Sequence, residues 1–286
     1  MPAPSFSTAS VRDYYDRNTP AFLRLGQGAG AIHRAVWGPG VTSRAEAFSY
    51  VDALVATEVR ALFASRELHV VDLGCGVGAS IASLARALPI RGTGVTLSPV
   101  QARIAAERLA AAGLADRVRC VEGDYTALPP TVADADAAYA IESFVHGPSP
   151  ERFCAEAARI IRPGGVLIIC DDVRRESSDP RAARVTEQFA RGWHVNTLVT
   201  SGELQQLAAT AGFDHDRTID LTPYLELGRP RDRAIRLLAA VAQWLPVQPT
   251  WLAPLVGGSA LQEGLQRGWL AYEFAIFRRR IDSAGP

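Results

Sequence analysis

Three glycines at alternating positions are the part of the sequence best suited to bind a cofactor. Gly74, Gly76 and Gly78 follow a short apolar run at 68–73, and a helical pattern begins directly after them. Glycine lets the backbone bend sharply and lets a ligand approach where a Cβ atom would collide. The N-terminus of the following helix offers unpaired N–H groups to a phosphate or carboxylate. This corner therefore predicts a site for a nucleotide-like cofactor that carries an anionic group.

The position of the acidic residue separates two cofactor classes that use such a corner. An NAD site with the loosened pattern G-x-G-x-x-A needs a carboxylate about 20 residues further on, at the end of the next strand. Here that strand, 92–97, ends in Ser98-Pro99, and the acid instead precedes the glycines as Asp72. The pattern Asp-x-Gly-x-Gly-x-Gly resembles the first motif of class I S-adenosylmethionine (SAM) methyltransferases. We therefore expect SAM as the cofactor, with NAD as the alternative.

Alternating strand and helix signals surround this corner. They predict an α/β fold, with a Rossmann-like, seven-stranded and mostly parallel sheet flanked by helices. In such a sheet the ligand binds at the carboxyl ends of the strands, so loops far apart in the sequence become neighbours. The expected strands cover 68–73, 92–97, 118–122, 135–141, 166–171, about 214–222 and about 271–279.

Helix start signals and the segments between strands suggest how the chain is organised. Ser98 precedes Pro99 at a first helical position, and Thr200 with Glu203 forms a capping box. A long helix is expected from about Ser43 onward. The predicted organisation is an N-terminal helical cap at 1–66, a SAM-binding core at 67–172, a lid insertion at 173–200, a continuation of the core at 201–222, a helical insertion on the substrate side at 223–268, and a last strand with a tail at 269–286.

The resemblance to SAM methyltransferases extends beyond the glycines. Residues 94–101, Gly-Val-Thr-Leu-Ser-Pro-Val-Gln, resemble the second motif of the branch that contains sterol, tocopherol and sarcosine methyltransferases, which often lacks the ribose-binding acid. The family's adenine-binding aspartate corresponds to Asp124, which could otherwise be a loop cap, and the family's N-terminal tyrosine, which closes over SAM, to Tyr15. The resemblance implies a cofactor-binding set of Asp72, Gly74, Cys75, Gly76, Gly78, Thr96, Leu97, Gln101, Asp124, Tyr125, Ile141 and Tyr15.

Glu142 and His146 are the predicted catalytic residues. They follow the strand 135–141, in a segment that resembles the active site of the family. Their spacing of four places both on one face if the turn is helical. The methyl group of SAM is already activated, so a base is needed only to take a proton from the nucleophile or from a cation formed by C-methylation. The alternatives are a capping glutamate and a structural histidine.

Aromatic residues in the cap and the insertions point to the substrate. An aromatic-lined lid suits a mid-sized apolar ligand. The run that begins at Tyr14 is similar to bacterial methyltransferases of natural-product pathways, including those acting on prenylated indole or terpenoid scaffolds. Trp37, Trp193, His194 and Tyr224 are the predicted substrate contacts. The alternative is that these aromatics are core residues of helical subdomains.

The composition limits the partners. Basic and acidic residues are equal in number, 30 and 30, which gives no electrostatic basis for nucleic-acid binding. The four cysteines contain no C-x-x-C pair, so neither a disulfide framework nor a metal site is expected. No apolar run approaches the ~20 residues of a membrane span, and the N-terminus lacks the features of a signal peptide. We expect a cytoplasmic protein that could be a homo-oligomer.

These observations predict a SAM-dependent methyltransferase of a hydrophobic small-molecule natural product, with S-adenosylhomocysteine as the second product. C-methylation of a terpenoid or prenylated, indole-type scaffold is the first hypothesis. The alternatives are O- or N-methylation of a secondary metabolite and C-methylation of a prenyl diphosphate, for which an arginine cluster at 229–236 could bind the phosphates. From other classes, a non-catalytic partner subunit with a SAM fold and an NAD oxidoreductase remain.

Overall fold

A seven-stranded sheet forms the centre of the protein, with the order β3-β2-β1-β4-β5-β7-β6. The computed structural model describes residues 6–25, 33–62, 66–229 and 252–281. β7 runs antiparallel to β5 and β6, and the other neighbouring strands are parallel, which confirms the predicted fold class. The strands are β1 (Leu68–Leu73), β2 (Ile90–Thr96), β3 (Val118–Glu122), β4 (Ala135–Ile141), β5 (Ile161–Arg174), β6 (Phe213–Asp220) and β7 (Leu270–Arg279).

Three helices begin where the sequence signals place them. Ser43 and Thr200 each form a complete capping box, and the Ser98 side chain accepts a hydrogen bond from the N–H of Gln101. The described helices are α1 (Thr8–Leu25), α2 (Arg44–Arg60), α3 (Ala79–Ala87), α4 (Pro99–Ala111), α5 (Pro150–Ile160), α6 (Pro180–Trp193), α7 (Ser201–Thr210) and α9 (Leu252–Gln266), with the short turns η1 (Phe144–His146) and η2 (Thr222–Tyr224).

β5 begins earlier than its apolar run suggests. A strand was expected at 166–171, yet β5 already starts at Ile161, which pairs with Ala135 ahead of a register shift. The buried carboxylate of Asp136 in β4 forms ion pairs with Arg66, which precedes β1, and with Arg162 in β5. The pair with Arg162 joins the first residues of β5 to the start of β4.

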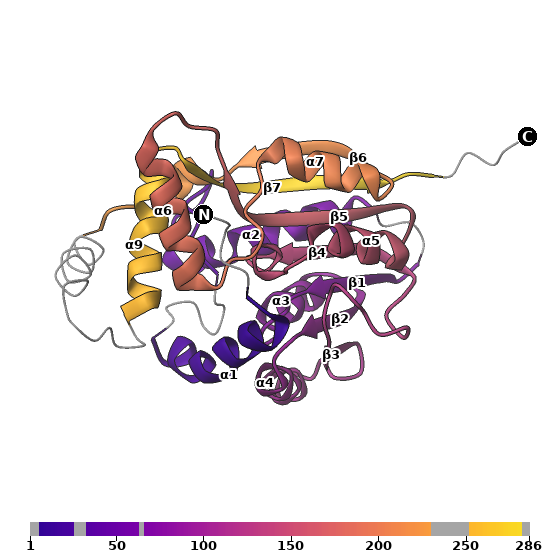
Figure 1. Ribbon diagram of the computed structural model, residues 1–286. Coiled ribbons are helices and arrows are strands. Elements are labelled where there is room, and N and C mark those ends of the chain that lie inside the picture. Colours follow the sequence, from indigo (N-terminus) through magenta and orange to yellow (C-terminus); the bar gives the residue numbers. More distant parts are fainter. Residues whose placement is uncertain (1–5, 26–32, 63–65, 230–251, 282–286) are drawn as a thin grey trace, which may run out of the picture.

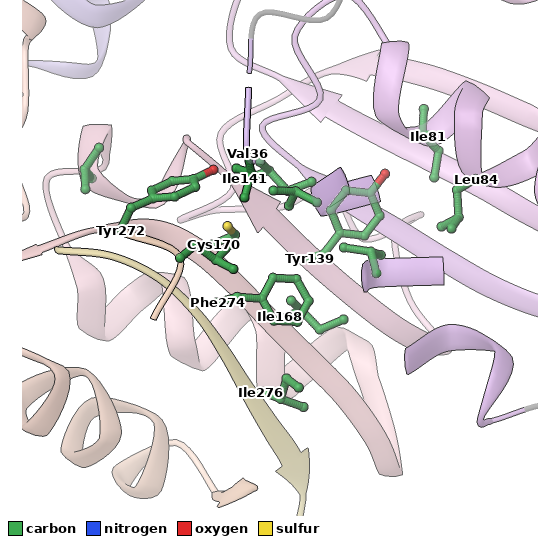
Figure 2. Close-up of a cluster of buried hydrophobic side chains, with 14 of the residues drawn as sticks. Val36, Ile81, Leu84, Tyr139, Ile141, Ile168, Cys170, Tyr272, Phe274 and Ile276 are labelled. Carbon is green, nitrogen blue, oxygen red and sulfur yellow. The ribbon is translucent and has the colours of Figure 1, made fainter. Parts of the chain in front are cut away.

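Helices cover both faces of the sheet and enclose two apolar clusters. On one face α2, α3 and α4 contribute Val55, Ile81 and Leu109, and Figure 2 shows Ile81 beside side chains of the central strands. On the other face α5 and α7 contribute Phe153 and Leu204. α2, although its residues fall in the predicted cap, therefore packs directly on the sheet as a flanking helix.

α1, α6 and α9 gather at the carboxyl ends of the parallel strands, at the left of Figure 1. α6 and α9 cross closely at two glycines, because a Cβ atom on Gly192 would lie 2.6 Å from the Cα of Gly257. Within the described residues no helix combines the length and apolar character needed to span a membrane. The middle of the predicted substrate-side insertion, 230–251, lies outside the described residues, and with it lie Arg231, Arg233 and Arg236.

The buried strands predict a clear contrast between two isoleucines. Ile168 is 0% exposed in β5, whereas Ile281 is 74% exposed after β7. Truncating Ile168 to Ala leaves a cavity and should lower the free energy of unfolding by about 2–5 kcal/mol. Ile281→Ala should change it by less than about 0.5 kcal/mol. Urea unfolding of both variants checks this, and equal effects would contradict the described packing.

Candidate active site

A cavity of about 500 Å³ lies at the carboxyl ends of β1, β2, β4 and β5. Its walls come from the glycine loop, the segment 96–101, the turn η1, and the helices α1, α6 and α9. Most of the side chains that face it from α6 and α9 are apolar or aromatic, including Phe189, Trp193 and Leu255. The cavity thus has a polar end at the strand tips and an apolar end between the helices.

The glycine loop folds as its sequence predicts. Gly74, Gly76 and Gly78 all have positive φ angles, of 103°, 52° and 74°. A Cβ atom on Gly76 would meet no other protein atom within 4 Å, and Gly76 lines the cavity. No side chain caps the N-terminus of α3, so its first N–H groups remain available to an anionic group. The loop is therefore an open cradle beside a helix N-terminus.

Polar side chains connect the second motif to α1. The hydroxyl of Thr96 donates to Oε1 of Gln101 at 2.8 Å, and Nε2 of Gln101 donates to the hydroxyl of Thr19 at 3.1 Å. The hydroxyl of Ser98 also donates to the carboxylate of Asp16. Gln101 and Thr96 are buried and line the cavity. α1 is thus attached to the loop after β2, on the side of the cavity next to the glycines.

Nine of the twelve residues in the predicted cofactor set line this cavity, and Asp72, Gly78 and Asp124 do not. Asp72 is buried, and its carboxylate accepts a hydrogen bond from the Tyr139 hydroxyl at 3.0 Å; burial raises its pKa to about 8. Asp124 accepts from the N–H and hydroxyl of Thr126 at 2.8 and 2.7 Å, which is the geometry of a loop cap. The nine that line the cavity are Gly74, Cys75, Gly76, Thr96, Leu97, Gln101, Tyr125, Ile141 and Tyr15.

His146 forms a pair with Tyr15 at the edge of the cavity. The Tyr15 hydroxyl lies 2.7 Å from Nε2 of His146, and Nδ1 of His146 lies 3.2 Å from the carbonyl oxygen of His194. A carbonyl only accepts, so Nδ1 carries the proton and Nε2 accepts from the Tyr15 hydroxyl. Burial lowers the pKa of His146 to about 4 and raises that of Tyr15 well above its ordinary value. Both side chains are therefore neutral near pH 7.

Glu142 is held by other groups rather than free to act as a base. It follows β4 with a positive φ of 50°. Its Oε1 accepts from the N–H of Arg34 at 3.0 Å and from the Tyr272 hydroxyl at 2.9 Å. Burial alone would raise the pKa of Glu142, but the charge of Arg34 and these hydrogen bonds outweigh it and lower the pKa. Of the two predicted catalytic residues, His146 is thus the better placed to accept a proton.

Three further charged residues at the cavity were not predicted from the sequence. Asp171 and Asp172 lie near the carboxyl end of β5, and the guanidinium of Arg34 contacts Asp172 at 2.8 and 2.5 Å. Burial and the neighbouring charge of Asp172 raise the pKa of Asp171 to about 8. The two aspartates could have been predicted from the sequence, because they lie at the carboxyl end of a strand, where ligands bind. Arg34 follows a glycine-rich stretch, and nothing in the sequence there indicates a site residue.

Only one of the four predicted substrate contacts lines the cavity. Trp193 faces it, and its indole N–H donates to the carbonyl of Pro254 at 3.0 Å. His194 lies behind the wall, with its ring 4.6 Å from that of Tyr14. Trp37 and Tyr224 contact each other elsewhere, since the N–H of Trp37 donates to the carbonyl of Tyr224 at 2.7 Å.

Comparison with known proteins identifies the family. A family model described as a methyltransferase domain matches residues 70–165. The methyltransferase GfsG of Streptomyces halstedii is 32% identical over 79% of both chains. The chain belongs to the SAM-dependent methyltransferases. Other relatives of this methyltransferase are the O-methyltransferase cnsE of Penicillium expansum, 33% identical over 79% of both chains, and the (+)-O-methylkolavelool synthase of Herpetosiphon aurantiacus, 30% identical over 79% of this chain and 78% of the relative.

Solved structures confirm the fold of the methyltransferase. The cyclase SpnF has a TM-score of 0.75 at 24% identity, with 98% of each chain covered. The geranyl diphosphate C-methyltransferase of Streptomyces coelicolor A3(2) has a TM-score of 0.65 at 17% identity, with 96% of this chain and all of the other covered. Sterol methyltransferases are among the further sequence relatives, which confirms the resemblance seen in the motifs. NAD is therefore set aside as the cofactor.

The open cradle fits SAM, and this predicts which glycine is indispensable. Gly76 and Gly40 both have positive φ, 52° and 82°, and both have no protein atom within 4 Å of a Cβ position, but only Gly76 lines the cavity. Gly76→Arg should therefore abolish S-adenosylhomocysteine binding, because its side chain occupies the cradle. Gly40→Arg carries a similar backbone strain and should bind normally. Calorimetry measures S-adenosylhomocysteine binding by both variants. Intact binding by Gly76→Arg would show that the cofactor does not bind at this loop.

Proposed function

We propose that the methyltransferase transfers the methyl group of SAM to a hydroxyl oxygen of a mid-sized, uncharged, apolar metabolite of the terpenoid type. The observation that carries this proposal is the neutral Tyr15–His146 pair at the edge of the cavity. An alcohol is a poor nucleophile unless its proton is taken during attack, so O-methylation is the reaction that most needs such a pair. The relatives named for O-methylation support the choice.

The hydrogen bonds of the pair suggest a route for the proton. SAM supplies an electrophilic methyl group on a sulfonium. The Tyr15 oxygen can accept a hydrogen bond from a substrate hydroxyl while its own proton points to Nε2 of His146. When the substrate oxygen takes the methyl group, the carbon–sulfur bond would break and leave S-adenosylhomocysteine, while the hydroxyl proton would move to Tyr15 and the proton of Tyr15 to Nε2. His146 becomes an imidazolium, which the carbonyl of His194 stabilises through Nδ1–H.

The charges of the cavity favour an uncharged substrate. Among the described lining residues Glu142, Asp171 and Asp172 are acidic and Arg34 is basic. The guanidinium of Arg34 is already paired with Asp172 and lies 3.5 Å from Glu142. A diphosphate would meet no unpaired cation among these residues and would lie beside buried carboxylates, which is unfavourable. Of the arginine cluster at 229–236, Arg229 is described, and it pairs with Glu226.

C-methylation of an alkene, the first hypothesis from the sequence, remains a second candidate. Aromatic rings of Tyr14, Tyr15, Phe48 and Trp193 line the cavity together with carboxylates. Aromatic faces and carboxylates stabilise a carbocation, the intermediate that follows methyl transfer to an alkene. The neutral His146 would then remove a proton from carbon. The two candidates therefore use the same residues and differ in the accepting atom.

The accepting atom can be read from labelled products. Purified enzyme is incubated with SAM carrying a CD3 group and a panel of terpenoid alcohols, the matching hydrocarbons and the matching diphosphates. We expect CD3 ethers from the alcohols, little product from the hydrocarbons and none from the diphosphates. Mass spectrometry and NMR locate the label. CD3 on a skeletal carbon would favour C-methylation, and turnover of a diphosphate would contradict the charge argument.

Replacing the base should slow the reaction without weakening cofactor binding. His146→Asn keeps a donor near the Nδ1 position but removes Nε2, so kcat should fall about 100- to 10,000-fold. In the wild-type enzyme the base is active while unprotonated, and its pKa is lowered to about 4. The kcat should therefore stay flat from about pH 7 to about pH 5, where an ordinary histidine would already be protonated. Glu142→Gln is the comparison, and a larger loss in that variant would assign the base to Glu142.

A further inference from the structure

Asn196 connects three parts of the structure that meet at the active site. Its Oδ1 accepts from the N–H of Phe6 at 2.7 Å, and its Nδ2 donates to the carbonyl of Phe6 at 3.0 Å. The same Nδ2 donates to the carbonyl of His146 at 2.8 Å, and its backbone N–H donates to the carbonyl of Val145 at 2.8 Å. The Asn196 side chain thus forms hydrogen bonds both with Phe6, which precedes α1, and with η1, which carries His146.

The segment around Asn196 holds η1 from one side. His194 has a positive φ of 54° at the end of α6, which turns the chain sharply. The following residues then run beside η1, where the hydroxyl of Thr197 donates to the carbonyl of Gly147 at 2.6 Å. Of the described residues in this segment, Asn196 alone bonds both η1 and Phe6 through its side chain. It is therefore the point where the position of α1 and the position of His146 are joined.

α1 covers the cavity and is held mainly by polar and aromatic contacts. In its middle α1 is tied to the segment after β2 through the hydrogen bonds of Asp16 and Thr19, and to η1 through the bond between Tyr15 and His146. Ahead of its first residue the ring of Phe6 lies 4.3 Å from the ring of His194. Without the bonds of Asn196, this N-terminal end would keep the ring contact of Phe6 but lose its main-chain anchor.

We propose that Asn196 is a positioning residue that latches the start of α1 onto η1, so that closure of α1 and alignment of the Tyr15–His146 pair occur together. The proposal rests on the proposed function for the role of His146. The bidentate bond to the backbone of Phe6 resembles strand pairing, so it depends little on which side chain stands at position 6. It also places a main-chain anchor just ahead of α1, which carries the cavity-lining residues Val11, Tyr14 and Tyr15.

The latch can be tested without the acceptor substrate. Hydrogen exchange of α1 is measured in the enzyme saturated with S-adenosylhomocysteine, for wild type, Asn196→Ala and Asn18→Ala. Asn18 donates to the carbonyl of Tyr14 at 2.7 Å within α1 itself and is the matched control. Loss of the two side-chain bonds to Phe6, together with the one to His146, should speed exchange in the first turns of α1 by at least about ten-fold in Asn196→Ala. Asn18→Ala should leave exchange at the Phe6 end unchanged.

A double-mutant comparison separates the hydrogen bond from the ring. Phe6→Ala removes the ring that contacts His194. Phe6→Pro removes both the ring and the N–H that donates a hydrogen bond to Oδ1 of Asn196. If the latch exists, the additional effect of Phe6→Pro over Phe6→Ala on exchange should disappear in the Asn196→Ala background. Additive effects would overturn the proposal, and so would wild-type exchange in Asn196→Ala. Thermal unfolding shows that each variant is folded.

Kinetics then distinguish a positioning role from a merely structural one. In Asn196→Ala, kcat should fall and its acid limb should move to higher pH, because water that reaches His146 reduces the burial that lowers its pKa. The groups that act on His146 are Tyr15 from α1, His194 after α6 and Glu142 after β4, Asp171 of β5 accepts from the N–H of the neighbouring Val145, and none of them is altered. An unchanged pH profile with reduced kcat would contradict the coupling. Faster exchange in Asn196→Ala with full activity of His146→Asn would instead contradict only the proposed base.

Discussion

The ion pair between Arg34 and Asp172 determines the shape of the active site. It joins the segment after α1 to the end of β5, and its guanidinium lies over the Tyr272 ring at 4.4 Å. Asp171 and Asp172 are both 2% exposed, and buried carboxylates without a partner are strongly destabilising. The segment at Arg34 is therefore held at the strand ends, where Arg34 and Asp172 both line the cavity.

Closure of this space depends on contacts of two different kinds. The sheet that carries the site is apolar and tightly packed, and Figure 2 shows Cys170 and Tyr272 in this buried cluster. α1 covers the cavity and forms hydrogen bonds with its surroundings through hydroxyl, amide and carboxylate groups. A hydrogen bond to the protein can be replaced by one to water at a small cost in free energy, whereas exposing packed apolar surface to water costs more. The same molecule thus combines a rigid base with a cover whose bonds can be broken and reformed, which suits an enzyme that must release S-adenosylhomocysteine.

Features coded locally were predictable, and features that depend on distant packing were not. The bounds of β1, β3 and β4 match their apolar runs, and the glycine loop has the positive φ angles that its residues allow. Trp37 and Tyr224 were expected at the substrate but contact each other, because the residue type alone does not say which part of the fold an aromatic side chain contacts. Arg34 was missed for a related reason, since its partners come 108 and 138 residues later. The roles assigned to individual site residues stay predictions.

The contact between Gly192 and Gly257 has a consequence for changing the substrate range. A Cβ on Gly192 would lie 2.4 Å from the carbonyl oxygen of Ala253, so the two backbones are as close as they can be. Any bulkier residue at this crossing would force α6 and α9 apart and misplace Trp193. A designer who wants to admit longer or broader acceptors should therefore leave the glycines intact and trim Phe189 or Leu255, whose side chains project into the apolar end of the cavity.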